Sequence, residues 1–426
     1  MTVELRNQRF LLLPWAICVA ALVFRVAFVF YEGHQVPPQA LAVVPFQNEV
    51  GSVAAALSQG KGFCCLFQQP TGPTAWIAPV YPFFLSGIFR AFGVFTVSSF
   101  YVAALFNCIF SALVCVPLFR VAERIANRTT AMAASCLWAI FPSAILIPFE
   151  WIWDTSLSAL LAISLLWFTL HLADHPQRRN FILYGVFWGF CLLTNPALGA
   201  VLPFFVLWLY LRFRLVQARY ASELVLSVAL ALLVCVPWTI RNAVQFHRVI
   251  PVRSDLPFEI WMGNNPIYDE HSRALNRITR YEQVHLYSQL GETAFLDQRG
   301  KEAREFIRSH PALCLKLASR RVIALWLGTS TPWRDFLRAD SAFVRFLFGW
   351  NLLTLLGTII GLLTLAIAKQ GFFLPMVAFP LAFPLIYYFT QESLRLRHPC
   401  DPALALLVAL AATWPWWRTK AHANRI

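Results

Sequence analysis

The sequence predicts an all-α polytopic membrane protein, and three observations favour this fold class. Hydrophobic residues make up 58% of the 426 residues, charged residues only 13%, and the mean hydropathy is +0.59. Soluble globular chains carry about a quarter charged residues, so this chain has too few charges to cover a surface that faces water. Apolar runs of about 20 residues, long enough to cross a bilayer as a helix, recur along the sequence. Lys and Arg gather in the short polar breaks between them.

The apolar runs and their basic flanks predict about ten membrane spans. The first run follows an acid as well as arginines and has no small-residue cleavage site, so we expect a retained span rather than a signal peptide. Breaks that carry Lys or Arg mark the cytoplasmic side, and with this orientation both termini are cytoplasmic. The predicted spans are 10–31, 97–119, 129–148, 154–173, 181–194, 197–211, 222–239, 342–368, 371–390 and 401–416.

The first external loop, residues 32–96, is predicted to contain two juxtamembrane helices. In 48–59, apolar residues recur at helical spacing, Asn48 can cap the helix and Gly60 can end it. The apolar stretch 78–93 is too short for a full span, so we expect it to be interfacial or re-entrant.

A second polar region, residues 240–340, has mixed charge and an amphipathic helical pattern around 292–326. It predicts a small external helical segment. The expected organisation is therefore an N-terminal transmembrane core over 1–239 that includes the first loop, this external segment, and C-terminal transmembrane helices over 341–426.

Charge and cysteine content exclude several other classes of protein. The formal net charge is +14, but the basic residues follow the membrane topology, and no basic motif with interleaved exposed aromatics indicates a nucleic-acid partner. Most of the ten cysteines fall within predicted spans, while Cys64 and Cys65 are adjacent in the first loop. Their spacings indicate neither a metal site nor a disulfide framework.

Glu49 is the only acid in the stretch PFQNEVGSVAAALSQGKGF, residues 45–63. As a first-turn residue it is stabilised by the helix dipole and the free backbone N–H groups. The functional alternative is a general base at the membrane surface, which takes a proton from an incoming hydroxyl. The helix dipole favours the charged carboxylate and desolvation favours the neutral acid, so the sequence leaves both interpretations open.

Two further residues are candidates for a binding pocket. Asp154 stands at the start of the fourth predicted span, where it either caps the helix or binds a hydroxyl-rich acceptor or a cation. Tyr81 lies in the proline-rich stretch TGPTAWIAPVYP, residues 71–82, which is either a stiff linker or the lining of a substrate groove.

Arginines at the predicted outer ends of spans form two clusters. Arg241 follows the seventh span, and Arg395, Arg397 and His398 lie in the short break before the last one. Such arginines often snorkel to lipid headgroups, but guanidinium groups also match phosphate oxygens in a bidentate way. Since no nucleotide-binding motif is present, we expect any bound phosphate to belong to a lipid.

Several landmarks follow one another along the chain, and together they span residues 49–402. They are Glu49, Ala54, Leu57, Gly60, Gly62-Phe63, Pro73-Thr74-Ala75, Pro79, Tyr81-Pro82, Phe92-Gly93, Arg241-Asn242, the stretch 261–266, Gly291-Glu292, His310-Pro311, and Arg395 to Pro402. In this order the landmarks resemble bacterial GT-C glycosyltransferases, in particular the protein mannosyltransferase-like and aminoarabinose transferase-like branch, which uses polyprenyl-phosphate sugars. The resemblance covers nearly the whole chain.

The resemblance implies roles for several residues. Glu49 corresponds to the proposed catalytic base, and Arg395 and Arg397, with Arg241 and His398, are implied to meet the lipid phosphate. Asn264 joins Asp154 and Tyr81 as a candidate for the sugar or acceptor pocket. Many relatives carry paired acids in the first loop, whereas Gln47 and Asn48 precede a single acid here. A divalent cation therefore stays an open question, and no other cofactor is expected.

The function implied is an inverting transfer of a sugar from a polyprenyl-phosphate donor to a hydroxyl of a protein, glycan or lipid. The reaction would take place on the outer side of the cytoplasmic (inner) membrane. Two alternatives are a transporter or flippase of lipid-linked saccharides, and a relative that binds such lipids without catalysis. A transporter is expected to place ionisable residues in mid-span, whereas the notable acids here lie at external helix ends.

Overall fold

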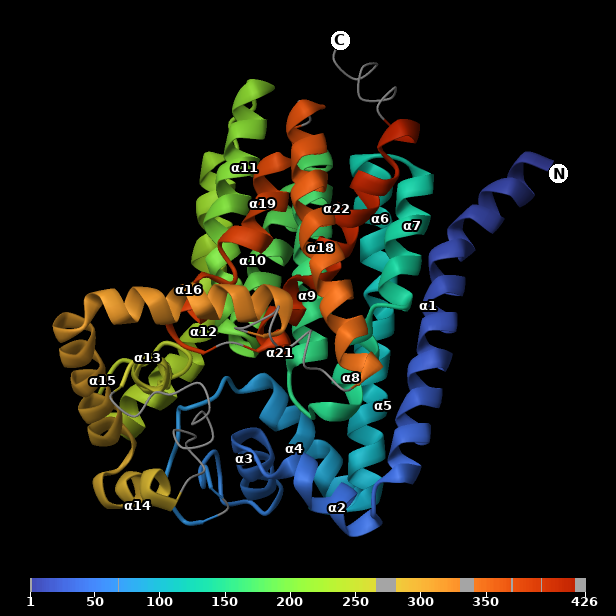
Figure 1. Ribbon diagram of the computed structural model, residues 1–426. Coiled ribbons are helices and arrows are strands. Elements are labelled where there is room, and N and C mark those ends of the chain that lie inside the picture. Colours follow the sequence, from blue (N-terminus) through green and yellow to red (C-terminus); the bar gives the residue numbers. More distant parts are fainter. Residues whose placement is uncertain are drawn as a thin grey trace.

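The computed structural model describes residues 2–67, 69–265, 281–329, 341–368, 371–391 and 393–417, with side chains from Leu12 onward. Every regular element within these ranges is a helix, and one isolated bridge pairs Cys64 with Pro73. Figure 1 shows an upright bundle with a lobe of shorter helices at one end. This agrees with the all-α polytopic fold predicted from the sequence.

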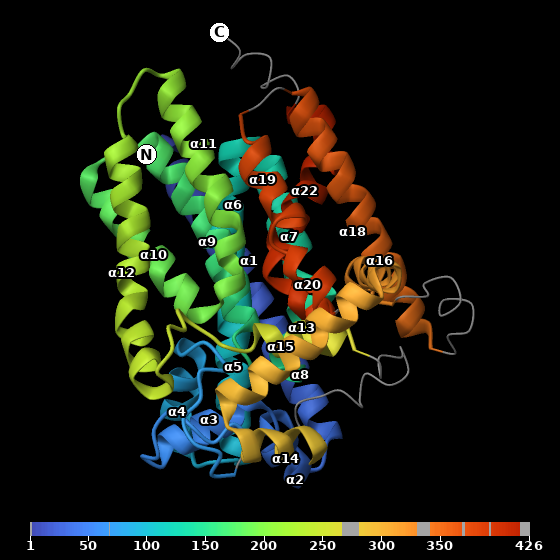
Figure 2. The ribbon, with the colours of Figure 1, turned by 90° about the vertical axis from the view of Figure 1, so that its left-hand side faces the viewer.

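The bundle contains the longest helices of the chain. Figure 2 shows α10, α11 and α12 on one side of it and α18 on the other. Its helices are α1 (Thr2–Gln35), α5 (Val97–Leu113), α6 (Cys115–Ile125), α7 (Arg128–Ala139), α8 (Pro142–Glu150), α9 (Thr155–Asp174), α10 (Arg178–Thr194), η2 (Pro196–Val201), α11 (Leu202–Leu215), α12 (Ala221–Phe246), α18 (Ala342–Ile367), α19 (Phe373–Leu381) and α22 (Asp401–Ala412).

The lobe combines the first loop with the long polar region after α12. From the first loop come α2 (Pro38–Val43), η1 (Val44–Phe46), α3 (Glu49–Ser58) and α4 (Val80–Phe92). From the polar region come α13 (Leu256–Gly263), α14 (Tyr281–Leu290), α15 (Glu292–Ser309) and α16 (Pro311–Leu327). The short helices α20 (Leu385–Phe389), α21 (Leu394–Arg397) and η4 (His398–Cys400) lie in the chain between α19 and α22.

Seven helical segments of the described chain are long and apolar enough to cross a membrane, or eight if the bent pair Pro38–Phe46 and Glu49–Ser58 is one span. The prediction of ten spans included three segments that are helical but shorter. These are α10 with 17 residues, the apolar segment Phe373–Phe389, and α22 with 12 residues. All three stand in the bundle beside the longer helices (Figures 1 and 2).

The helices predicted in the two polar regions are present. The helix expected over 48–59 is α3, and the short apolar helix expected over 78–93 is α4. The amphipathic pattern around 292–326 forms two helices rather than one, because the chain bends between α15 and α16. The bend falls at His310-Pro311, where the proline cannot continue the preceding helix but suits the first turn of the next.

Arg25, buried in the middle of α1, supports the break between α7 and α8. Its guanidinium donates to the carbonyls of Trp138 at 2.9 Å and Ala144 at 2.8 Å. Pro142 has no N–H group, so it cannot donate to the carbonyl of Trp138, four residues earlier. The Trp138 carbonyl accepts from the Phe141 N–H at 3.2 Å, and the arginine adds a second donor. These hydrogen bonds account for a charged residue at a membrane depth where charges are rare.

Glu292, at the start of α15, joins the two halves of the lobe. Its buried carboxylate accepts hydrogen bonds from the Thr74 hydroxyl and from the Ala75 backbone N–H at 2.8 Å. It also accepts from the hydroxyls of Ser254 at 2.7 Å and Tyr287 at 2.8 Å. A buried carboxylate is costly unless such donors surround it, and here they come from both the first loop and the polar region.

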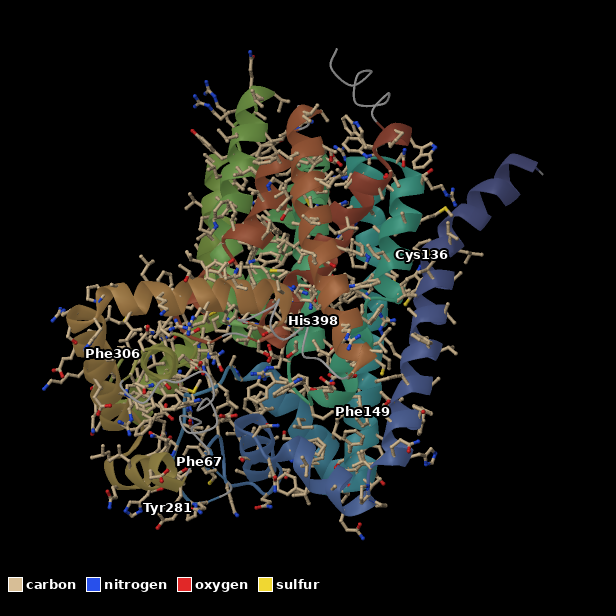
Figure 3. All side chains as sticks on the ribbon, in the orientation of Figure 1. Phe67, Cys136, Phe149, Tyr281, Phe306 and His398 are labelled. Atoms are coloured by element: carbon tan, nitrogen blue, oxygen red, sulfur yellow. The ribbon has the colours of Figure 1, made fainter. Side chains whose placement is uncertain are left out.

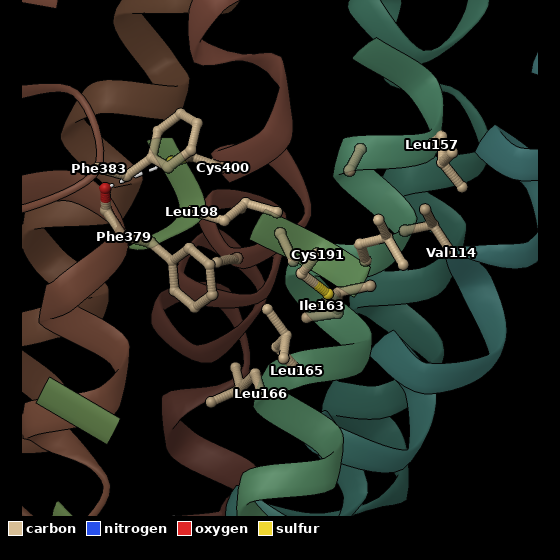
Figure 4. Packing of buried hydrophobic residues seen from close by; sticks show 14 of the residues in the cluster. Val114, Leu157, Ile163, Leu165, Leu166, Cys191, Leu198, Phe379, Phe383 and Cys400 are labelled. Atoms are coloured by element: carbon tan, nitrogen blue, oxygen red, sulfur yellow. Dashed lines mark hydrogen bonds between the residues drawn. The ribbon is translucent and has the colours of Figure 1, made fainter. Parts of the chain in front are cut away.

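The core of the bundle consists of tightly packed apolar side chains. Figure 4 shows Ile163 and Leu166 of α9, Cys191 of α10 and Phe379 of α19 within one cluster. On the far side, α18 and α22 approach so closely that a Cβ atom on Gly361 would lie 2.2 Å from the backbone oxygen of Leu407. Only glycine allows this helix contact.

We predict that Gly361→Ala destabilises the protein by about 1–3 kcal/mol, because a methyl group there forces α18 and α22 apart. Gly349→Ala on the same helix is the matched control, since nothing lies within 4 Å of its Cβ position. Alanine has a higher helix propensity than glycine, so Gly349→Ala should leave the free energy of unfolding unchanged or raise it by up to about 1 kcal/mol. Thermal unfolding of the detergent-solubilised variants measures both effects, and equal melting temperatures would contradict the packing argument.

Candidate functional site

A cavity of about 1070 Å³ lies where the lobe meets the bundle. Its polar lining converges from segments that are far apart in sequence. The first loop supplies Glu49, the start of α9 supplies Asp154, α13 and the residues before it supply Arg253 and Glu259, and α21 supplies Arg395. The apolar part of the wall includes Trp76, Tyr81, Trp151, Trp153 and Tyr387.

Glu49 is the first residue of α3 and lines the cavity. Asn48 caps the helix by accepting a hydrogen bond from the Gly51 N–H at 2.8 Å. The turn before the helix is tight, because a Cβ atom on Gly51 would lie 2.2 Å from the carbonyl oxygen of Phe46. Local sequence therefore fixes where the carboxylate lies.

Burial raises the pKa of Glu49 above its ordinary value. Arg395 and Arg253 act in the opposite direction, and the negative charge of Asp255 adds to the rise. Desolvation is the largest of these causes, so it outweighs the nearby positive charges. A carboxylate with a raised pKa is a stronger base than a solvated one, which suits proton abstraction from a hydroxyl.

Arg395 is a cation whose guanidinium points at the cavity without a partner in the described part of the chain. Its Cζ lies 4.2 Å from the ring centroid of Trp151 and 4.7 Å from that of Trp153. No hydrogen bond from the guanidinium is formed to any described residue, and its buried Nε is unpaired. Burial lowers the pKa of Arg395, but an arginine starts so high that it keeps its charge. Its N–H groups are therefore available to an anion.

Asp154 and Tyr81 both line the cavity, as sequence reasoning suggested. Asp154 precedes α9 without a side-chain capping bond, and its carboxylate accepts from the Ser158 hydroxyl at 2.7 Å. Burial raises the pKa of Asp154, and Ser158, Arg253 and Arg395 oppose the rise. The Tyr81 hydroxyl donates to Asn107 at 2.9 Å, so its ring rather than its hydroxyl is presented to the cavity.

Three charged residues of the lining were missed by sequence reasoning. Arg253 donates through Nε to Asp255 at 2.7 Å and also contacts it through Nη2. Glu259 accepts from the Gln391 amide at 2.7 Å, and burial together with the charge of Asp255 raises the pKa of Glu259 to about 8. The signal was a charged pair followed by an acid in the otherwise apolar stretch VRSDLPFEIW, residues 252–261.

Arg397 and His398 lie in the protein interior and do not line the cavity. Arg397 donates to Asp401, Asn351 and the Trp326 carbonyl, each at 2.9 Å. His398 is fully buried, and its Nδ1 lies 2.9 Å from the Ser143 hydroxyl. Figure 3 shows His398 inside the bundle, near its junction with the lobe. Both residues anchor the segment that carries Arg395.

Arg241 and Asn264 also lie outside the cavity lining. Arg241 donates to the carbonyls of Phe63 at 2.8 Å and Thr74 at 2.7 Å, so it ties α12 to the first loop. Asn264 donates to the carbonyls of Ile260 at 2.8 Å and Phe389 at 2.9 Å. Of the eight candidate residues, Glu49, Tyr81, Asp154 and Arg395 are brought together.

An apolar groove of about 470 Å³ lies beside the cavity. Its wall consists only of apolar or aromatic residues, namely Pro79, Val80, Phe83, Leu193, Val234, Pro237 and Trp238. Ala78 and Thr194 line the cavity, and their chain neighbours Pro79 and Leu193 line the groove. A ligand with a polar head and an apolar tail could therefore occupy both.

No group of three or more His, Cys, Asp or Glu side chains among the described residues is arranged to hold a metal ion. The acids that line the cavity are accompanied instead by Arg253 and Arg395.

Comparison with known proteins supports the family predicted from the sequence. Residues 74–240 match the family model of dolichyl-phosphate-mannose-protein mannosyltransferases. No curated protein matches the sequence. The oligosaccharyltransferase of Archaeoglobus fulgidus, in complex with Zn and sulfate, has a similar structure, with 13% identity and a TM-score of 0.53. The match covers 96% of this chain and 50% of the archaeal one.

A second structure of that archaeal enzyme, AglB with an inhibitory peptide and a dolichol-phosphate, matches with 12% identity and a TM-score of 0.54. It covers 97% of this chain and 51% of AglB. ArnT from Cupriavidus metallidurans in the apo state is less similar, with 14% identity, a TM-score of 0.39, and coverage of 96% and 78%. The chain thus spans about half the length of AglB.

The family match over residues 74–240 and the shared fold agree with the resemblance to GT-C glycosyltransferases, and the described helices agree with multiple membrane spans. The resemblance noted in the sequence is thereby confirmed.

The different surroundings of the two arginines of α21 lead to a stability prediction. Arg397→Gln leaves Asp401 buried without its cation, so we expect a loss of about 3–5 kcal/mol. Arg395→Gln removes the cation–π contacts with Trp151 and Trp153 but no hydrogen bond to a described residue, so the loss should stay within about 2 kcal/mol. Thermal unfolding of both purified variants tests this contrast. A large loss in Arg395→Gln would mean that Arg395 supports the fold rather than a ligand.

Proposed function

We propose that this protein is an inverting glycosyltransferase that moves a sugar from a polyprenyl-phosphate donor to an acceptor hydroxyl. One observation carries the proposal: the carboxylate of Glu49 faces the same cavity as the guanidinium of Arg395, which has no hydrogen-bonded partner among the described residues. The first is suited to take a proton, and the second to bind a phosphate.

The reaction follows from these two groups. Glu49 takes the proton of the acceptor hydroxyl as its oxygen attacks the anomeric carbon from the side opposite the lipid phosphate. The bond between that carbon and the phosphate oxygen breaks, and the electron pair leaves with the phosphate. Arg395 stabilises the charge that develops there. One displacement inverts the anomeric configuration.

The apolar groove supports a lipid-linked donor. An isoprenoid chain has no polar group beyond its phosphate, and it matches a wall of seven apolar or aromatic residues. The phosphate would lie in the cavity while the chain follows the groove between α4, α10 and α12. The similar archaeal enzyme AglB has been solved with a dolichol-phosphate and an inhibitory peptide, which fits a donor and acceptor of this kind.

Supporting roles are proposed for the remaining candidates. Asp154 and the ring of Tyr81 would contact the sugar or the acceptor. Arg397 and His398 would position α21 and so Arg395, rather than bind phosphate directly. Arg241 would position the first loop, and Asn264 would hold the segment at Phe389.

We further propose that the cavity opens to the outer side of the cytoplasmic membrane. The start of α1 and the end of the described chain lie at one end of the bundle, and the lobe lies at the other (Figure 1). The basic breaks between spans belong to the end that carries the termini, which supports cytoplasmic termini.

Glu49→Gln should lower the transfer rate by about 10²–10⁴-fold, because the amide cannot accept the hydroxyl proton. The assay follows radiolabelled polyprenyl-phospho-sugars in the presence of membrane extract. Glu282→Gln is the control, since Glu282 is exposed on α14 outside the cavity. Undiminished transfer by Glu49→Gln would exclude Glu49 as the base, and lipid movement without transfer would indicate a flippase.

The raised pKa of Glu49 predicts a pH dependence. Glu49 must be deprotonated to act as the base, so kcat/KM should rise with pH as Glu49 loses its proton. The midpoint of this acidic limb should lie above the ordinary carboxyl pKa of 4.5. Asp255→Asn removes a charge that raises the pKa of Glu49 and leaves Arg253 to lower it. The limb of this variant should therefore shift to lower pH. An upward shift, in a variant that unfolds like the wild type, would contradict the assignment.

A further inference from the structure

A small hairpin in the first loop carries two adjacent cysteines. The Thr74 N–H donates to the Phe63 carbonyl at 3.1 Å, and the Cys65 N–H donates to the Gly72 carbonyl at 3.1 Å. An isolated bridge pairs Cys64 with Pro73 between these bonds. Both cysteines are half-buried, so small reagents can reach them.

The two thiols of this hairpin are held in contact. Their Sγ atoms lie 2.7 Å apart, and the Cys64 thiol also lies 3.4 Å from the Lys61 carbonyl. Cys65 has a φ of 66°, a left-handed conformation that is rare for a residue with a side chain. The backbone thus adopts an uncommon geometry that places both sulfurs together.

The base of the hairpin is fixed from two sides. Arg241 donates to the carbonyls of both Phe63 and Thr74, and Glu292 accepts from Thr74 and Ala75. These contacts hold the backbone on either side of the cysteines, so the thiols are presented in one arrangement. Figure 3 shows Phe67, from the same loop, among the side chains of the lobe.

We propose that Cys64 and Cys65 are a redox modification site, at which a disulfide-class oxidant reversibly closes a disulfide between the two adjacent residues. One thiolate attacks the oxidant disulfide, forms a mixed disulfide and releases the first oxidant thiol. The other cysteine then attacks the bonded cysteine sulfur and releases the second. Two electrons pass to the oxidant, and the two protons of the cysteines end on its thiols.

The bond formed in this way is easily reversed. The Cα atoms of neighbouring residues are only about 3.8 Å apart, whereas those of ordinary disulfides are about 4.4–6.8 Å apart, and deviation stores strain. Strained disulfides have more oxidising potentials and are the labile ones. An outward-facing lobe would meet the oxidising conditions in which disulfides form.

The hairpin also borders both ligand surfaces. The ring centroid of Phe63 lies 4.7 Å from that of Trp238, which lines the groove. Trp76, two residues after the hairpin closes, lines the cavity. Closing the disulfide changes the hairpin between these points, so oxidation is expected to change the transfer rate. This effect on rate rests on the proposed function, whereas the disulfide itself does not.

The test uses the full-length protein in detergent, treated with oxidised glutathione and then with iodoacetamide. In the wild type, the peptide with Cys64 and Cys65 should lose the mass of two hydrogen atoms, carry no glutathione and resist alkylation. Dithiothreitol should restore alkylation of both residues. Cys64→Ser should instead retain a glutathione adduct at Cys65, because no second thiol displaces it. Cys314→Ser, which removes a half-buried cysteine outside the hairpin, should behave like the wild type.

Two outcomes would overturn the proposal: a stable glutathione adduct in the wild-type peptide, or full alkylation of both cysteines after oxidation. Neither readout depends on catalysis. A failure of the proposed function would appear only in the transfer assay, so the two failures are distinguishable.

Discussion

The buried carboxylate of Glu292 is the contact on which the candidate site depends. It accepts hydrogen bonds from Thr74 and Ala75 of the first loop and from Ser254 and Tyr287 of the polar region. A carboxylate without such donors would be too costly to bury. Glu292 can therefore stay buried only while the first loop and the polar region are held together around it. The cavity wall is built from both segments and exists only when they are joined.

Electrostatics inside the cavity follow from this enclosure. Desolvation raises the pKa values of Glu49, Asp154 and Glu259 against the pull of Arg395. The acids and the arginine lie close enough to influence one another, yet Arg395 forms no ion pair with a described acid. The carboxylates thus remain basic while the guanidinium remains free, and both properties are needed for a proton acceptor beside an anion site.

The sequence predicted the helical fold and the helices of the two polar regions. It also named eight candidate residues, of which four line the cavity. It could not separate Arg395 from Arg397, because a break this short has no periodic pattern from which a helix could be predicted. The segment forms the short helix α21, where residues two apart point to opposite sides. One arginine therefore faces the cavity and the other the core. Arg253, Asp255 and Glu259 stand out as charges within residues 252–261, but they reach the site through long-range folding, and the local pattern does not reveal which distant segments they meet.

The pairing of the arginines bears on the head group of the proposed donor. Arg253 is matched by Asp255, whereas Arg395 has no ion pair with a described residue. Among the described residues of the lining, Arg395 is thus the arginine left for an anion, and it lies near several carboxylates. In the proposed reaction, a diphosphate head would bring a second negative group into low-dielectric surroundings with no further unmatched cation among the described residues to offset it. We therefore expect the proposed donor to carry a single phosphate rather than a pyrophosphate.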